Sequence, residues 1–170
     1  MRQSEIIELY AYNRWANARI LNAATGIDDA QFCAPLLPGL PSLRHILAHA
    51  YGAEWIWRKR CEEGFSPVAM PSADEFPSIS ALHTRWTPEQ EAMRAFVGQL
   101  SNAQLEAKMA YRTTSGKKLA APLWQVLLHV VNHGTQHRAE AAALLTALGR
   151  SPGDIDLIVY VREQQAAGHA

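Results

Sequence analysis

The sequence predicts an all-α fold, a four-helix bundle with a small β-hairpin before the last long helix. Four long stretches carry apolar residues at the spacing of an amphipathic helix, and segments rich in glycine and proline separate them. The chain has 170 residues, of which 48% are hydrophobic, enough to build one sizeable core. We therefore expect residues 1–170 to form a single domain.

The first helix is expected from Ser4 to about Ala24. The hydroxyl of Ser4 can cap its first turn, and Gly26 is a residue that tolerates a left-handed conformation after its last turn. The following stretch, Phe32–Pro41, contains three prolines and a glycine, so we expect a loop there.

The second helix is expected to begin near Pro41 and Ser42 and to end at about Glu63. Proline suits the start of a helix, serine can cap it, and Gly64 would end it. The segment Phe65–Pro77 has three more prolines and is expected to be an irregular connection.

The third helix is expected from Ser78 to about Leu100, with a kink or an internal break near Pro88. From Lys108 to Ala120 the apolar pattern alternates on either side of Ser115-Gly116, which predicts a small β-hairpin. The last long helix is expected to follow this hairpin.

Proline and glycine also mark the two ends of that last helix, expected from Pro122 to Leu148 with Gly149 as its stop. A short final helix is expected over Asp156–Arg162.

The charge balance excludes several classes of partner. Lys plus Arg number 16 and Asp plus Glu number 16, so the net charge is zero. Nucleic acids and anionic membrane surfaces usually require a basic patch, so we expect neither as a partner. The N-terminus lacks the pattern of a signal peptide, and no stretch approaches about 18 consecutive apolar residues. Two cysteines, Cys33 and Cys61, are too few for a disulfide framework, and we expect a cytoplasmic protein.

The most informative residues are histidines at four-residue intervals in the last long helix: His129, His133 and His137. Steps of four residues advance about 40° around a helix, so the three rings lie on one broad face. Each ring could be a core histidine bonded to a backbone carbonyl. Burying unpartnered imidazoles would cost on the order of 1–3 kcal/mol each, however, and one divalent cation satisfies two at once. The HExxH protease motif is absent, because Val130 and Ile46 occupy the positions of its glutamate.

The second helix offers a further ligand. His49 adjoins its apolar stripe, and His45 lies one turn earlier. Either ring could face the last long helix, and periodicity mildly favours His49. Three imidazoles would leave a position open for water or substrate, as in catalytic metal sites. Such a site suits zinc, nickel, copper or iron.

Three segments of the sequence form recognisable motifs. They are Tyr12-Asn13-Arg14-Trp15-Ala16-Asn17, Ser42-Leu43-Arg44-His45-Ile46-Leu47-Ala48-His49 followed by Glu54-Trp55, and Leu128-His129-Val130-Val131-Asn132-His133-Gly134-Thr135-Gln136-His137-Arg138. These motifs resemble those of the DinB-like family of metal-binding four-helix bundles, and the resemblance covers nearly the whole chain. The segment in the last long helix is the most specific, and Gly149 and Asp156-Leu157 also fit the family's closing stretch.

The resemblance implies a metal site with His49, His133 and His137 as its ligands. His45 and His129 then become neighbours that support the ligands or lie at the surface. Characterised members of the family are mostly thiol-dependent. Some transfer a low-molecular-weight thiol to electrophiles, and others isomerise maleylpyruvate with a thiol such as mycothiol. The implied cofactors are a divalent metal (zinc, nickel or iron) and a low-molecular-weight thiol.

Three further polar residues are weighed for the site. Glu140 follows Ala139 where the family often has Gly-Gln, and it could approach the metal or its water, or pair with a cation such as Arg138. Arg138 could bind a substrate carboxylate, with an exposed surface position as the alternative. Glu54 lies about 140° around the helix from His49, so we expect a boundary carboxylate outside the site.

These observations lead to two hypotheses of different classes. The first is a metal-dependent enzyme that uses a low-molecular-weight thiol with an electrophilic small-molecule substrate, or, as a variant, a metal-dependent hydrolase. The second is a non-catalytic metal-binding stress or interaction protein. Five tryptophans at helical positions suit core packing or a dimer surface, and we expect a homodimer.

Overall fold

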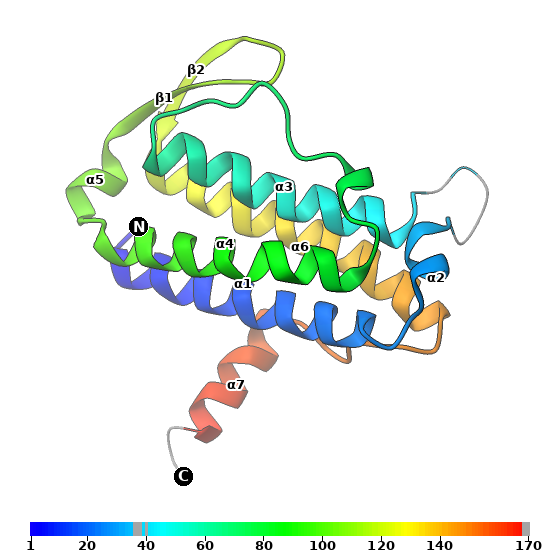
Figure 1. Cartoon of the computed structure of the whole chain (residues 1–170). Helices are drawn as coiled ribbons and strands as arrows, with labels where there is room; N and C mark the ends of the chain where they lie inside the picture. Colours follow the sequence, from blue (N-terminus) through cyan, green and yellow to red (C-terminus); the bar gives the residue numbers. More distant parts are fainter. Residues whose placement is uncertain (36–38, 40, 168–170) are drawn as a thin grey trace.

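Four long helices lie side by side and form the body of the molecule (Figure 1). The computed structural model describes residues 1–35, 39 and 41–167. The first and second long helices stand diagonally opposite each other, since each packs against the third and the fourth. The predicted all-α bundle is confirmed. Its members are α1 (Gln3–Ala24), α3 (Leu43–Glu62), α4 (Ile79–Gln99) and α6 (Leu123–Ala147).

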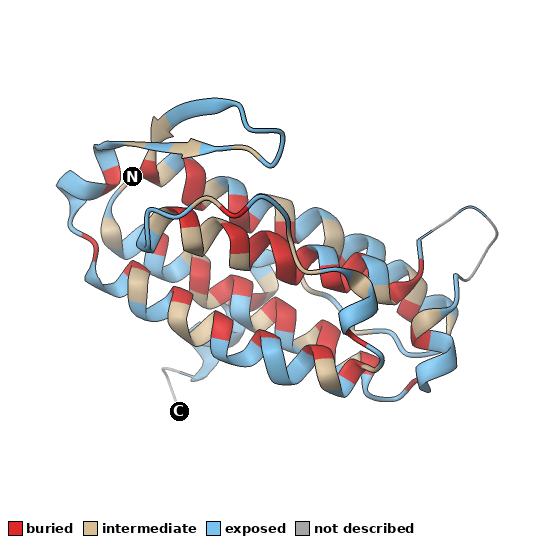
Figure 2. Ribbon diagram, turned by 45° about the horizontal axis from the view of Figure 1, so that its top comes forward, coloured by how far each residue is buried: buried red, intermediate tan, exposed pale blue. Residues whose placement is uncertain are grey.

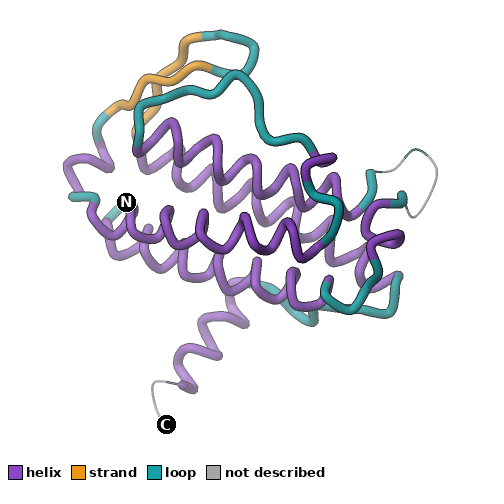
Figure 3. The backbone as a smooth tube through the Cα atoms, viewed as in Figure 1, coloured by secondary structure: helices purple, strands orange, loops and turns teal. Residues whose placement is uncertain are grey.

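Short elements connect the long helices (Figure 3). The predicted hairpin is present before α6, at the end of the bundle where α3 ends (Figure 1). The last helix, α7, projects from the bundle and packs on α1. The short elements are α2 (Asp29–Cys33), η1 (Ala73–Glu75), α5 (Asn102–Glu106), β1 (Lys108–Arg112), β2 (Lys118–Pro122) and α7 (Leu157–Ala167).

Most of the predicted helix ends are found where local chemistry places them. The hydroxyl of Ser42 accepts a hydrogen bond from the backbone of His45 at the start of α3, and Ser78 caps α4 in the same way. Gly64 and Gly149 follow α3 and α6 in left-handed conformations, with φ of 64° and 73°.

The first helix ends at Ala24, as predicted, but the residues that cap it differ from the prediction. It begins at Gln3, and Ser4 does not cap it, because the carboxylate of Glu5 accepts the backbone N–H of Arg2 at 2.8 Å. Gly26 is not left-handed, since Thr25 follows the helix in a right-handed conformation. The N-terminal end therefore depends on a contact between Arg2 and Glu5 that the position of one serine did not reveal.

Three further expectations need correction. The predicted loop Phe32–Pro41 overlaps α2, which forms because Asp28 caps it and because Phe32 is fully buried; residues 36–38 and 40 lie outside the described residues. Helix α4 continues through Pro88 without a break, since Pro88 faces solvent, where water can hydrate the carbonyl that proline leaves unbonded. The short helices α5 and η1 were not predicted.

The hairpin closes one end of the seam between α3 and α6. Its strands pair antiparallel, with Tyr111 opposite Leu119, and the left-handed Gly116 forms its turn. The ring of Tyr111 packs edge-on against that of Trp57 on α3, with centroids 4.9 Å apart. The hairpin thus brings an aromatic side chain to the C-terminal end of α3.

Buried residues fill the space between the long helices, and exposed residues cover their outer faces (Figure 2). This two-sided pattern is the amphipathicity on which the prediction of a bundle rested. Among the described helices, none combines the length and the apolar character that a membrane crossing requires.

Candidate metal centre

The structure brings three of the five clustered histidines together across the seam between α3 and α6. Nε2 of His133 lies 3.3 Å from Nε2 of His49 and 3.3 Å from Nε2 of His137. One ligand atom from each ring lies within 4.8 Å of the other two. We call His49, His133 and His137 the histidine triad.

The donor atoms of the histidine triad fit a divalent cation. In tetrahedral coordination with bonds of about 2.0–2.1 Å, neighbouring ligand nitrogens stand about 3.3–3.4 Å apart, as two of these nitrogen pairs do. Burial, together with the neighbouring His137 and His49, lowers the pKa of His133 to about 4, and burial also lowers the pKa of His49. These two rings are therefore neutral near pH 7, which is the form that binds metal.

Glu140 contacts the ring of His137 through Nδ1, the nitrogen that does not face His133. Its carboxylate lies 2.7 Å from Nδ1 of His137, three residues earlier on α6. A proton on Nδ1 donates to this carboxylate and leaves the lone pair of Nε2 directed at the other two rings. Of the roles weighed for Glu140, the structure shows this contact with His137 and not a pair with Arg138.

The two remaining clustered histidines have different surroundings. Nδ1 of His45 lies 2.8 Å from the hydroxyl of Ser42, at the N-terminal end of α3 and apart from the triad. The ring of His129 lies one turn from the triad, with its centroid 5.6 Å from that of His133 and 5.6 Å from that of Trp57.

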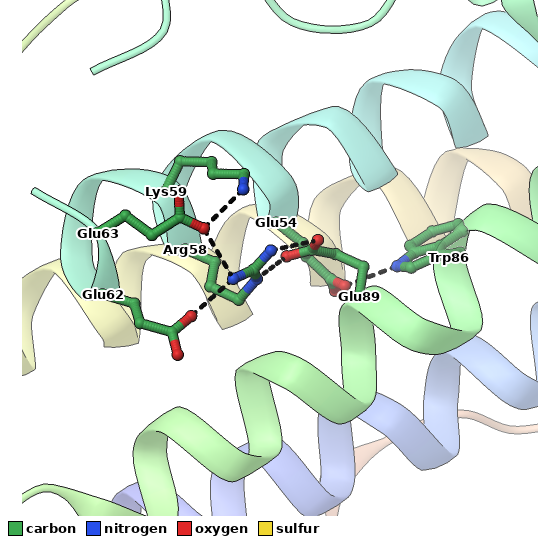
Figure 4. A network of polar contacts seen from close by, with 7 residues as sticks. All are labelled: Glu54, Arg58, Lys59, Glu62, Glu63, Trp86 and Glu89. Carbon is green, nitrogen blue, oxygen red and sulfur yellow. Dashed lines mark hydrogen bonds and ion pairs between the residues drawn. The ribbon is translucent and has the colours of Figure 1, made fainter. Parts of the chain in front are cut away.

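On the opposite face of the same helices, a buried polar network joins all four members of the bundle. Glu54 accepts hydrogen bonds from the amides of Asn13 and Asn17. It also accepts one from the indole of Trp86 at 2.6 Å, and Figure 4 shows this contact. The amide oxygens of both asparagines in turn accept from the guanidinium of Arg138. We call these five residues the central network.

The central network corrects two expectations. Arg138 is 1% exposed, so the alternative of a surface arginine is wrong, and three side chains already accept from its terminal nitrogens. Glu54 is 4% exposed and lies in the core, not at its boundary. The missed signal was the pair Asn13 and Asn17, two amides one turn apart on the apolar face of the first helix.

Gly134 allows this network to approach α6. A Cβ atom at this position would lie 2.8 Å from a terminal nitrogen of Arg138 and 3.1 Å from the amide oxygen of Asn13. Gly134 lies between His133 and His137 in the sequence, but it faces the central network, which leaves no room for a larger residue.

A second polar cluster ties α3 to α4 beside the central network (Figure 4). The guanidinium of Arg58 pairs with the buried carboxylate of Glu89 and also reaches Glu62 and Glu63. These bonds raise the pKa of Arg58. The charged groups of this cluster pair with one another, so we assign the cluster a structural role.

One of the chain's two thiols, that of Cys61, is poorly suited to nucleophilic chemistry. Both cysteines are free and partly buried. Burial raises the pKa of the Cys61 thiol to about 12, so it stays protonated near neutral pH.

Comparison with known proteins places the chain in a family. The protein named Protein DinB of Bacillus subtilis (strain 168) is 26% identical over 168 residues, which cover 94% of this chain and 96% of that relative. The model of the DinB family matches residues 1–167, nearly the full length. The chain therefore belongs to the DinB family.

Proposed function

We propose that the chain binds a divalent cation through the histidine triad and uses it to activate a low-molecular-weight thiol toward an electrophile. The observation that carries this proposal is the convergence of three imidazole nitrogens from two helices. A cation bound there would stabilise a thiolate, the reactive form of a thiol, near neutral pH.

The residues of the site have distinct parts in this proposal. His49, His133 and His137 present their Nε2 lone pairs, and Glu140 keeps the proton of His137 on Nδ1. Three protein ligands leave a coordination position for an external group, whereas structural zinc sites are closed by four. His49 is the most exposed residue of the triad, so an external group could reach a bound cation from solvent.

In this proposal the thiol comes from outside the chain. Cys61 is protonated near neutral pH, and its sulfur contacts that of Met109 at 3.5 Å, away from the triad. A soluble thiol is also the cofactor that the family resemblance implies. The proposed reaction class is therefore transfer of an external thiol to an electrophilic carbon.

The test combines metal analysis with a thiol screen. Protein freed of metal and reloaded with zinc, nickel or iron is assayed with several thiols and a chromogenic aryl halide. We expect about one cation per chain and turnover that depends on both metal and thiol, and that is lost in His133→Ala. Stoichiometric metal without turnover with any thiol would contradict the thiol reaction and favour metal-dependent hydrolysis or a non-catalytic role. A folded wild type that binds no metal would overturn the whole proposal.

A further inference from the structure

A cavity of about 200 Å³ lies next to the histidine triad, between α3, α6 and the hairpin. His129 forms its wall toward the triad, since its ring is also in contact range of His133. Two aromatic rings and an amide form much of the rest, a lining suited to the organic part of a small ligand. The lining residues are Trp57, Tyr111, Ala121, Gln125, Val126 and His129.

Arg60 is packed against the aromatic wall of this cavity. Its guanidinium carbon lies 4.6 Å from the ring centroid of Trp57 and 5.7 Å from that of Tyr111. The residue is 7% exposed. The two rings hold the guanidinium in place, so little side-chain entropy would be lost when it binds an anion.

Arg60 also lacks the partners that other buried arginines have. Its Nε is buried without a hydrogen bond, and within the described part of the chain no acceptor or carboxylate pairs with the guanidinium. Burial lowers the pKa of Arg60, since no carboxylate offsets it. Arg44 and Arg138 share the unbonded Nε, but their terminal nitrogens have acceptors. A buried cation without an acceptor indicates a place for an anionic ligand group.

The position of Arg60 along α3 relates it to the triad. It follows His49 by eleven residues, which is about three helical turns, about 20° in angle and about 16 Å along the axis. Trp57 lies between them along α3, and its ring lines the cavity. A ligand that reaches from the triad to Arg60 therefore has to be extended, as a small thiol with a polar tail is.

We propose that this cavity binds a low-molecular-weight thiol that bears a carboxylate, with Arg60 as its anion-binding residue. The inference rests on the proposed function for the position of the sulfur, at the triad. Guanidinium pairs with carboxylate through two parallel hydrogen bonds, which matches the unused donors of Arg60. The rings of Trp57 and Tyr111 pack against the part of the ligand between its sulfur and its carboxylate.

The test compares glutathione with its diethyl ester, in which both carboxylates are replaced by neutral ester groups and the thiol is kept. Their dissociation constants for zinc-loaded protein are measured by calorimetry. We expect wild type to prefer the acid by about tenfold or more, as for a hydrogen bond to a charged group. Arg60→Met should abolish this preference and keep its metal content. The matched control, Arg112→Met, removes an exposed cation of the hairpin and should leave the preference unchanged.

Three results would overturn the inference. They are equal binding of acid and ester by wild type, a preference that persists in folded Arg60→Met, and a preference that Arg112→Met abolishes as fully as Arg60→Met does. If Arg60→Met does not fold, Arg60→Lys replaces it; we expect this variant to keep part of the preference, because the charge remains and the paired geometry is lost.

Failure of the inference and failure of the proposed function give different results. Cobalt-loaded protein is titrated with glutathione and monitored for a thiolate-to-cobalt charge-transfer band. A band without any preference for the acid refutes the role of Arg60 and leaves the thiol reaction standing. A preference for the acid that depends on Arg60, without a band, supports the anion-binding cavity and refutes the thiol reaction.

Discussion

The histidine triad and the central network are polar clusters that share α3 and α6, yet they have opposite properties. His137 and Arg138 are neighbours in the sequence, but His137 points into the partly exposed seam between α3 and α6, and Arg138 points into the core. On α3, His49 likewise belongs to the triad, and Glu54 belongs to the central network. A turn of about 100° per residue is enough to separate a candidate metal centre from a structural core.

The difference lies in how each cluster satisfies its polar atoms. In the central network donors meet acceptors, because the amides of Asn13 and Asn17 donate to Glu54 and accept from Arg138. Only Nε of Arg138 is left without a bond. The triad consists of like groups, so neutral rings that face one another cannot all be satisfied by protons. A complete cluster stabilises the fold, and an incomplete one is suited to bind a ligand.

The largest effect on stability is expected from breaking the central network. Glu54→Ala should lower the free energy of unfolding by about 3–5 kcal/mol, because it leaves three buried donors without their acceptor and the buried guanidinium of Arg138 without a nearby negative charge. Urea unfolding of metal-free protein measures this loss. Glu91→Ala, which removes an exposed carboxylate, is the control and should cost at most about 1 kcal/mol. Equal losses in both variants would contradict the structural role.

Substitution of a triad histidine should reduce metal binding and leave the stability of the metal-free fold nearly unchanged. His133→Ala should remove the bound metal, because two imidazoles do not make a tight site. It should also abolish the rise in melting temperature that metal gives wild type, which corresponds to about 2.7 kcal/mol at a metal concentration of 100 Kd. Without metal, its melting temperature should stay close to that of wild type. A full metal complement in His133→Ala would refute the triad as the binding site.

Acid should empty the triad reversibly. Protons compete with metal for the same lone pairs, so affinity falls as pH falls. Because the pKa of His133 is lowered to about 4, the loss should occur at lower pH than for an ordinary histidine, between about pH 6 and pH 4. The same shift makes the metal-free fold less stable in this window, since the unfolded chain takes up the proton more readily. Metal analysis after dialysis and melting curves at each pH measure both effects; release near pH 7 would contradict the low pKa.

A smaller effect is expected from Glu140. Glu140→Ala should weaken metal binding by about 10–100-fold, because the carboxylate that orients His137 is lost. The side chain of Glu140 is 44% exposed, so unfolding of the metal-free protein should change little. Competition with a chromophoric chelator measures the affinity. Gln136→Ala, also exposed on α6, is the control, and an equal loss there would argue against a specific role of Glu140.

The smallest effects on metal are expected from the two histidines outside the triad. His45→Ala should keep the cation, since the ring contacts Ser42 and not the triad. His129→Ala should also keep it, with a loss of at most about 10-fold, because its ring touches His133 without presenting a convergent ligand atom. If His45→Ala empties the site and His49→Ala does not, the assignment on α3 is reversed.

The local part of the structure could be predicted from the sequence alone. Helical periodicity located the four long helices, and Ser42, Ser78, Gly64 and Gly149 marked ends that the structure retains. The spacing of His133 and His137 placed both rings on one side of α6. These features depend on residues within one or two turns of each other, so the order of the chain contains them.

Only the tertiary structure decided what lies across from each helix. Periodicity left both His45 and His49 open, and the register of α3 against α6 brings His49 to the other two rings. It also turns Arg138 inward, toward asparagines more than a hundred residues earlier in the chain. Such contacts depend on the relative height and rotation of packed helices. Those are set by the fit of all side chains in the interface, and no single segment of sequence encodes them.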